Sequence, residues 1–261
     1  MLDLPFKLAE AVQDYGSQTR RRVLSILRML EPHHAAGLRK VRLGRTFDGG
    51  YVMADDFTGA TAAYSLGVSQ DVSWDMDIAS RGIDVFQYDP TIQRLPELHA
   101  RFAWKSIGVG AHAITDGSVD TLAGIVRMNG HERDRDLLLN CDIEGHEWSV
   151  FAGMYVAVIA QFRQIVLEVH ALQQLCQPEF AEVARRAICN LTAHHRVIHV
   201  HANNYGPWAV LGGIPVPTVL ELTLLRSDRG VLEPSHERFP SELDMPNDPK
   251  TGDFPLGDFR F

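Results

Sequence analysis

Cysteine, long apolar runs and excess positive charge are all scarce in this sequence. It has three cysteines among 261 residues, an odd and widely spaced set that argues against a disulfide framework and fits a reducing compartment. The longest apolar stretch, residues 150–160, is too short to cross a bilayer, and charged residues interrupt the N-terminus where a signal peptide needs an apolar core. We therefore predict a cytoplasmic protein with no membrane partner.

The net charge of the chain bears on the class of partner that it can bind. The formal net charge is −8, whereas binding to nucleic acid depends on patches of lysine and arginine. The compact basic cluster at residues 20–22 lies in a segment where leucine and isoleucine recur near helical spacing, which is typical of a solvated helix face. We expect no nucleic acid partner, and a small molecule or sugar as substrate.

Hydrophobic patterning divides the chain into three parts. Residues 1–45 are predicted to form amphipathic N-terminal helices, a helical cap that either covers a site or joins two subunits as a homodimer. Residues 46–228 alternate short apolar strands with helices and form the predicted core. Residues 229–261 are rich in proline, aspartate and glycine and lack periodicity. Their phenylalanines favour a tail that packs on the core over a disordered one.

The core pattern predicts an α/β fold built on a doubly wound, seven-strand, Rossmann-like sheet. Alternating strands and helices imply a mostly parallel sheet with helices on both faces. The last strand follows the Gly212-Gly213 turn and is expected to return antiparallel. The predicted strands span residues 62–66, 84–88, 104–109, 137–141, 164–169, 197–200 and 218–225.

The first two predicted strands end in residues suited to a nucleotide-type cofactor. Gly67 ends the first strand, where a glycine lets backbone amides approach a ligand. Asp89 ends the second, and a carboxylate there can accept hydrogen bonds from both ribose hydroxyls. The loop lacks the G-x-G-x-x-G spacing of a dinucleotide site. Together with seven strands and a final antiparallel hairpin, Gly67 and Asp89 favour S-adenosylmethionine over NAD. The predicted cofactor-binding residues are Gly67, Val68, Ser69, Asp71, Asp89, Pro90 and Gly108.

An acidic run follows the fourth predicted strand, and it is the most informative stretch of the chain. Residues 140–148 read NCDIEGHEW and follow the apolar run 137–139. Carboxylates at the end of a strand sit where open α/β sheets bind ligands, and burying them without partners costs several kcal/mol. Glu144 and Glu147 have an alternative role, because acidic residues also stabilise the N-terminus of the following helix.

Strand ends in the second half of the core offer metal ligands. Asp142, His170 and His201 would form a carboxylate and two-imidazole set suited to Mn, Fe, Co, Ni or Zn more than to Mg. Glu168 shares a strand face with His170. The competing interpretation is that both histidines are hydrogen-bonded core residues. The predicted catalytic residues are Asp142, His146 and His170, with a histidine as the proton acceptor.

The stretch from Tyr64 to about Leu225 resembles the FkbM family of class I S-adenosylmethionine-dependent methyltransferases. The similarity lies in the Asp-x-Glu-Gly-x-Glu motif at residues 142–147 and the Glu-Val-His strand end at residues 168–170. It implies a seven-strand methyltransferase sheet and methyl transfer, usually to oxygen. Residues 48–51 (DGGY) and 246–249 (PNDP) lie outside this region and are similar to a methyltransferase-like subgroup.

Three functions are consistent with these features. The leading one is an O-methyltransferase that acts on a hydroxyl of a small molecule or sugar, in which a divalent metal would hold and acidify the acceptor. The alternative is a metal-dependent enzyme of another class, a hydrolase or oxygenase, on the same scaffold. The third is a non-catalytic binding module, against which the combination of Asp142, His170 and His201 argues.

Overall fold

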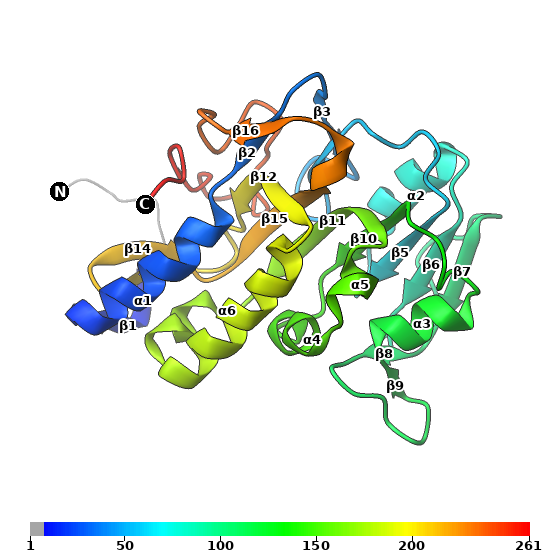
Figure 1. Ribbon diagram of the computed structural model, residues 1–261, viewed down its shortest axis with the longest axis horizontal. Coiled ribbons are helices and arrows are strands. Elements are labelled where there is room, and N and C mark those ends of the chain that lie inside the picture. The colour runs from blue at the N-terminus through cyan, green and yellow to red at the C-terminus, as the bar shows by residue number, and fades with distance from the viewer. Residues whose placement is uncertain (1–7) are drawn as a thin grey trace.

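A seven-stranded sheet forms the centre of the computed structural model, which describes residues 8–261 (Figure 1). Its strand order is β12-β15-β11-β10-β5-β6-β7. This confirms the predicted α/β class and doubly wound sheet. Along the sheet the strands are β12 (His195–Ala202), β15 (Leu220–Arg226), β11 (Phe162–Val169), β10 (Leu137–Cys141), β5 (Ala62–Leu66), β6 (Val85–Tyr88) and β7 (Phe102–Lys105).

The direction of the strands sets the position of a crevice. All neighbours are parallel except β15, which runs antiparallel to both β11 and β12, as the sequence predicts for the last strand. The chain winds outward from β5 to β7 and then restarts at β10 on the other side of β5. In such sheets, ligands bind outside the carboxyl ends of the strands at this reversal point. We therefore expect a ligand site at the C-terminal ends of β5 and β10.

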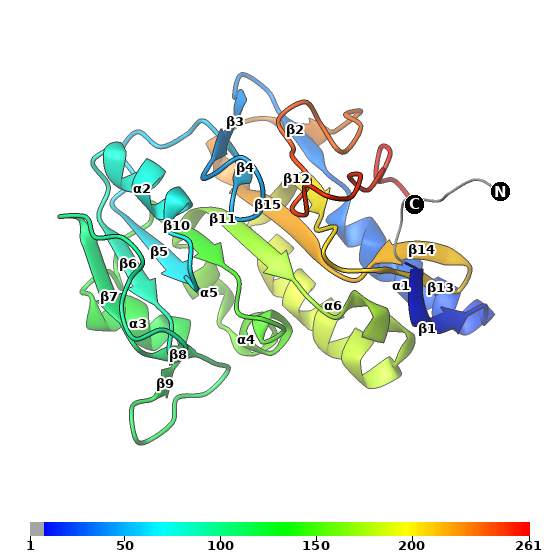
Figure 2. The same ribbon diagram turned by 180° about the vertical axis from the view of Figure 1, so that it is seen from behind.

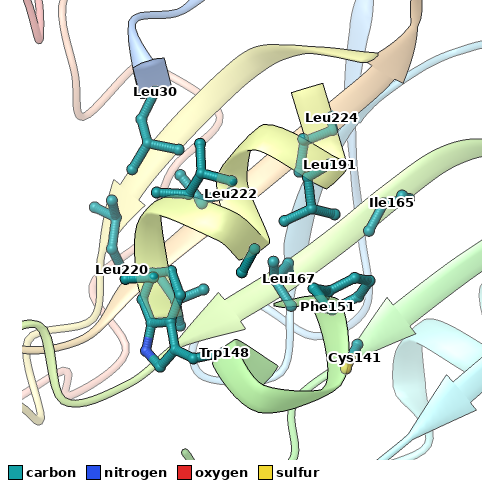
Figure 3. Close-up of a cluster of buried hydrophobic side chains, with 14 of the residues drawn as sticks. Leu30, Cys141, Trp148, Phe151, Ile165, Leu167, Leu191, Leu220, Leu222 and Leu224 are labelled. Carbon is teal, nitrogen blue, oxygen red and sulfur yellow. The ribbon is translucent and has the colours of Figure 1, made fainter. Parts of the chain in front are cut away.

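Helices cover both faces of the sheet (Figures 1 and 2). One face packs against α2 (Ser73–Ser80) through Trp74 and Ile78. The other face carries the larger core, part of which Figure 3 shows around Phe151 and Leu167. The helices on this side are α1 (Ser17–Leu27), α3 (Leu122–Met128), α4 (Glu147–Gly153), α5 (Val156–Ile159) and α6 (Pro178–Thr192), with the 3-10 turns η1 (Arg28–Leu30) and η2 (Leu172–Cys176).

Two predicted core elements differ from the structure. The third strand, expected at residues 104–109, ends at Lys105, and the chain then turns so that β8 (Gly108–Val109) pairs with β9 (Val119–Asp120) outside the main sheet. The helix expected near residues 149–160 divides into α4 and α5, because Met154 and Tyr155 adopt extended backbone conformations.

The N-terminal segment is not purely helical, which corrects the prediction of a helical cap. Residues 1–7 lie outside the described residues. The β1 strand (Leu8–Asp14) pairs with β13 (Trp208–Leu211), which pairs in turn with β14 (Ile214–Pro217). Pairing with a distant strand overrides local helical spacing here. Two more short strands follow α1 in this segment: β2 (His33–Ala35) pairs with β16 (Leu232–Pro234), and β3 (Lys40–Leu43) with β4 (Tyr51–Ala54).

The C-terminal tail lies against the folded core. It begins after the 3-10 turn η3 (Ser227–Arg229) and β16, and Figure 2 shows it passing close to β12. Phe239, Phe254 and Phe259 are buried in the main core cluster. Polar residues of the tail, Asp244 and Asp253, bind His199 and His201 of β12. Within residues 8–261, no helix combines the length and apolarity needed to cross a bilayer.

Candidate functional site

The tips of β5 and β10 meet at Gly67, which fixes the floor of the site. Its φ is +81°, and a Cβ there would stand 1.6 Å from the carbonyl oxygen of Asp142. The backbone is held in this place because the Gly67 amide donates to Tyr88 and the Asp142 amide donates to Leu66. Any side chain would collide with the neighbouring backbone, so glycine is the residue that lets the two tips touch.

Two cavities open on either side of Gly67 and share Gly67, Ser69 and Asp142 in their walls. We call them the large cavity, of about 630 Å³, and the small cavity, of about 270 Å³. Among the residues predicted to bind the cofactor, those that line the large cavity are Gly67, Ser69, Asp89, Pro90 and Gly108. Val68 and Asp71 line the small cavity, together with Gly67 and Ser69.

Asp89 is held rigidly at the wall of the large cavity. It is 2% exposed. One carboxylate oxygen accepts from the Ser69 amide at 2.7 Å, and the other from the amide and hydroxyl of Thr91 at 2.7 and 2.6 Å. Ionised carboxylates have about four acceptor positions, so Asp89 keeps capacity for a ligand hydroxyl. Apolar residues Val109 and Ile114 complete the wall beside it.

Carboxylates surround His170 at the tips of β10 and β11. The Nε2 atom of His170 lies 3.2 Å from Glu168, 3.5 Å from Glu144 and 3.9 Å from Asp142. Its Nδ1 atom lies 3.4 Å from Glu147. Ligand atoms of Asp142, Glu168 and His170 all fall within 4.8 Å of one another, which is the spacing of a metal-binding set.

The electrostatics of this acidic cluster favour a bound cation. Burial and then the Glu168 carboxylate raise the pKa of Asp142 well above its usual range. Burial also raises the pKa of Glu168. Burial alone lowers the pKa of His170, but the neighbouring Glu147 and Glu168 carboxylates outweigh it and raise this pKa to about 11. The imidazole is therefore protonated at neutral pH, and its positive charge offsets part of the buried negative charge.

His201 does not join this cluster, which corrects the predicted metal set. Its Nδ1 atom lies 3.0 Å from Glu221 and its Nε2 atom 3.1 Å from Asp253. The prediction treats the strands of His170 and His201 as neighbours. In the sheet β15 lies between them, and Glu221 of β15 pairs in register with both Glu168 and His201. Glu168 therefore takes the place predicted for His201.

The remaining residues of the acidic motif have separate roles. Glu147 is fully buried in the first turn of α4 and accepts from the amides of Ile143 and Gly145, at 2.9 and 3.0 Å, so it holds the preceding loop against the start of the helix. Its acidic group in the first turn also has the helix-stabilising role that the sequence left open for it. His146 is exposed at the N-cap of α4 and lines the large cavity, and it is outside the set formed by Asp142, Glu168 and His170.

Several residues of the site are not among those predicted from the sequence. Tyr51 of β4 lines the small cavity, and burial followed by the charges of Glu168 and Asp142 raises its pKa far above the usual range. Asn247 of the tail donates to Asp48 at 3.1 Å and to Glu221 at 2.7 Å. The motifs DGGY and PNDP contain these residues, but nothing local in either motif indicates that they meet.

The strand order, with the antiparallel β15 between β11 and β12, is that of the Rossmann-like class I methyltransferase fold. No family model matches the chain, so the FkbM resemblance stays a prediction from its residues. No curated protein matches it either.

Among the solved structures that are similar to the chain are two methyltransferases, each at 14% identity. One is a precorrin-6y C5,15-methyltransferase from Geobacter metallireducens GS-15, with 86% of this chain and 95% of that chain covered and a TM-score of 0.32. The other is a point mutant of a 16S rRNA (adenine(1408)-N(1))-methyltransferase from Catenulisporales acidiphilia, with 71% and 97% covered and a TM-score of 0.31. Likeness at this level says nothing about the substrate.

Proposed function

We propose that the protein is an S-adenosylmethionine-dependent methyltransferase that acts on a hydroxyl group of a small molecule or sugar. The observation that carries this proposal is the pair of cavities at the reversal point of the sheet, joined at Gly67 and Asp142. The large cavity has the volume of a small-molecule site. Asp89 would accept a ribose hydroxyl there, and Pro90, Val109 and Ile114 would contact the adenine ring.

The reaction needs a proton acceptor next to the acceptor hydroxyl. A bound S-adenosylmethionine would supply the methyl group and leave as the neutral thioether, and the acceptor hydroxyl would have to give up its proton to a protein group. A base with a raised pKa suits this step. We assign it to Glu168, whose pKa burial raises to about 6, because the raised pKa values of Asp142 and His170, about 9 and about 11, leave both protonated at neutral pH. His170 holds the two carboxyl groups in place.

The acidic cluster also fits a divalent cation. Two carboxylates and an imidazole form a suitable donor set for Mn, Fe, Co, Ni or Zn, and Oδ1 of Asp142 is buried without a hydrogen-bond partner among the described residues. Asp142, Glu168 and His170 would hold the ion, with His170 deprotonated. A bound ion would supply Lewis-acid stabilisation of the acceptor oxygen.

The same cluster supports a second candidate function, a metal-dependent hydrolase or oxygenase, because one imidazole and two carboxylates are sufficient for such chemistry. The two functions differ in their need for the cofactor. Turnover that requires metal but not S-adenosylmethionine would favour the second.

The test of the first function is calorimetric titration with S-adenosylhomocysteine, the demethylated product. We expect saturable binding that is lost in Asp89→Ala, because the ribose contact disappears. Asp84→Ala is the matched control, since Asp84 is exposed next to the opposite end of β6 and pairs with Arg101 at 2.8 Å. Absence of product and cofactor binding in folded wild-type protein, with or without metal, would overturn the proposal.

The metal is tested separately by titration with Mn²⁺. Glu168→Gln should abolish binding because it removes a charge from the donor set while preserving shape. Glu144→Gln should retain binding, because Glu144 is 84% exposed and stands outside the set. Equal binding by both variants would remove the metal from the mechanism and leave the methyltransferase proposal intact.

A further inference from the structure

Two neighbouring asparagines follow β12 in a turn that the proposed function does not yet use. Asn203 and Asn204 are 5% and 1% exposed. Connecting turns normally lie on the surface and expose their polar side chains to water. A buried amide needs hydrogen-bond partners within the protein, so the partners of these two residues indicate what each of them does.

Asn203 holds the carboxylate of Glu168. Its Nδ2 atom donates to both carboxylate oxygens, at 3.2 and 3.3 Å. The other end of the amide fixes this orientation, because Oδ1 accepts from the Tyr205 amide at 2.9 Å. A reversed amide would place its oxygen against the Glu168 carboxylate and leave the Tyr205 amide without this acceptor.

Glu168 needs such a donor because a second carboxylate lies beside it. Glu221 of β15 pairs with Glu168 in register, and like charges repel each other. Within residues 8–261, the side chains that approach Glu168 as donors are Asn203 and His170, whose Nε2 atom lies 3.2 Å away. If His170 is deprotonated to hold a cation, Asn203 is the donor that remains.

Asn204 holds the C-terminal tail. Its Nδ2 atom lies within 3.4 Å of four tail oxygens, which are the carbonyl oxygens of Asp248, Thr251 and Gly252 and the hydroxyl of Thr251. Its Oδ1 atom accepts from the Asp248 amide at 2.6 Å. An amide nitrogen has two hydrogens to donate, so this part of the tail is folded closely around one side chain. Figure 2 shows the tail passing beside β12.

We propose that Asn203 is a positioning residue for Glu168, and that docking of the tail on Asn204 keeps Asn203 in place. The two asparagines are consecutive in one short turn, so a shift of residues 248–252 that displaces Asn204 also displaces Asn203 and the carboxylate that it holds. The inference rests on the proposed function, in which Glu168 takes the proton and belongs to the metal-binding set. The tail thus helps to order the acidic cluster.

Asn203→Ser separates the two contacts of the amide. Serine can still accept from the Tyr205 amide within the turn, but its side chain is too short to reach Glu168. We expect Mn²⁺ to bind about tenfold or more weakly in calorimetric titration, which is the usual effect of losing a residue that orients a metal ligand. Asn204→Leu should also weaken Mn²⁺, although the hydrogen bonds of Asn204 within residues 8–261 go to the tail.

Asn190→Leu is the matched control. It removes a partly buried amide that donates to backbone carbonyls at the end of α4, such as that of Phe151 at 2.9 Å, and it should leave the Mn²⁺ affinity unchanged. S-Adenosylhomocysteine should bind equally to all three variants, since neither Asn203 nor Asn204 lines the large or the small cavity. Unchanged Mn²⁺ affinity in Asn203→Ser or in Asn204→Leu would overturn the inference.

Wild-type protein that binds no Mn²⁺ would remove the metal from the proposed function, and crystal structures would then decide the inference. We expect the Glu168 carboxylate to be rotated or shifted in both Asn203→Ser and Asn204→Leu, relative to crystals of the wild type. A carboxylate that stays in place would overturn the inference. Folded wild-type protein that binds no S-adenosylhomocysteine would instead overturn the methyltransferase function.

Discussion

Replacing Gly67 by alanine should damage both stability and cofactor binding. The position has φ of +81°, which costs a residue with a Cβ about 1–2 kcal/mol. In addition the new methyl group would stand 1.6 Å from the Asp142 carbonyl oxygen, which is backbone and cannot rotate away. Forcing the strand tips apart adds about 1–3 kcal/mol, so the free energy of unfolding should fall by roughly 2–5 kcal/mol in total.

Gly82 provides a control that isolates the clash. Its φ is +82°, and a Cβ there would meet nothing within 4 Å. Gly82→Ala should therefore lose about 1–2 kcal/mol from backbone strain alone. Both variants can be measured by urea unfolding and by titration with S-adenosylhomocysteine. Equal losses of stability, or unchanged ligand affinity in Gly67→Ala, would refute the claim that contact between the β5 and β10 tips forms the site.

Two further predictions concern stability. Burial raises the pKa of Asp75 to about 6 from 3.8, so the folded state favours the neutral acid: its contribution is complete below pH 3.8 and is lost as the pH rises through 6. Asp75→Asn should gain up to about 3 kcal/mol over wild type between pH 4 and pH 8 in urea unfolding, and a constant difference would contradict this. Phe239→Ala should lower the free energy of unfolding by about 3–5 kcal/mol, because the ring is 2% exposed and packs edge-on against His199. Val231→Ala, at an exposed position, is the control and should change it by less than about 0.5 kcal/mol.

The parts of the fold that the sequence predicts well are the fully buried strands. The bounds predicted for β5 and β10 match the structure, because each is a short apolar run that a polar or glycine residue ends. The edge strand β7 begins earlier than predicted, since it alternates intermediate and exposed residues and its apolar signal is weak. The β1 strand escapes prediction because its pairing partner lies some 200 residues away, at β13.

The candidate site also has one part that the sequence predicts and another that it does not. Asp142, Glu168 and His170 come directly at or after strands, and parallel neighbours carry such residues to one edge, so their convergence could be predicted. The prediction wrongly includes His201 because it assumes that strands consecutive in the chain are neighbours in the sheet. In the structure, β15 lies between β11 and β12. Contacts of the tail, such as Asn247 with Asp48, depend on the path of an aperiodic segment and leave no periodic signal.

The charge around the cavities should make the site bind the cofactor more tightly than its product. S-Adenosylmethionine carries a sulfonium charge that disappears on methyl transfer, while the ammonium and carboxylate groups of its amino-acid end are unchanged. The carboxylates of Asp89 and Glu144 line the large cavity, so the site presents negative charge to the cofactor. Such a wall attracts the cationic cofactor more strongly than the thioether product. The product therefore loses an attraction that the cofactor has, which favours its exchange for a new cofactor molecule after each turnover.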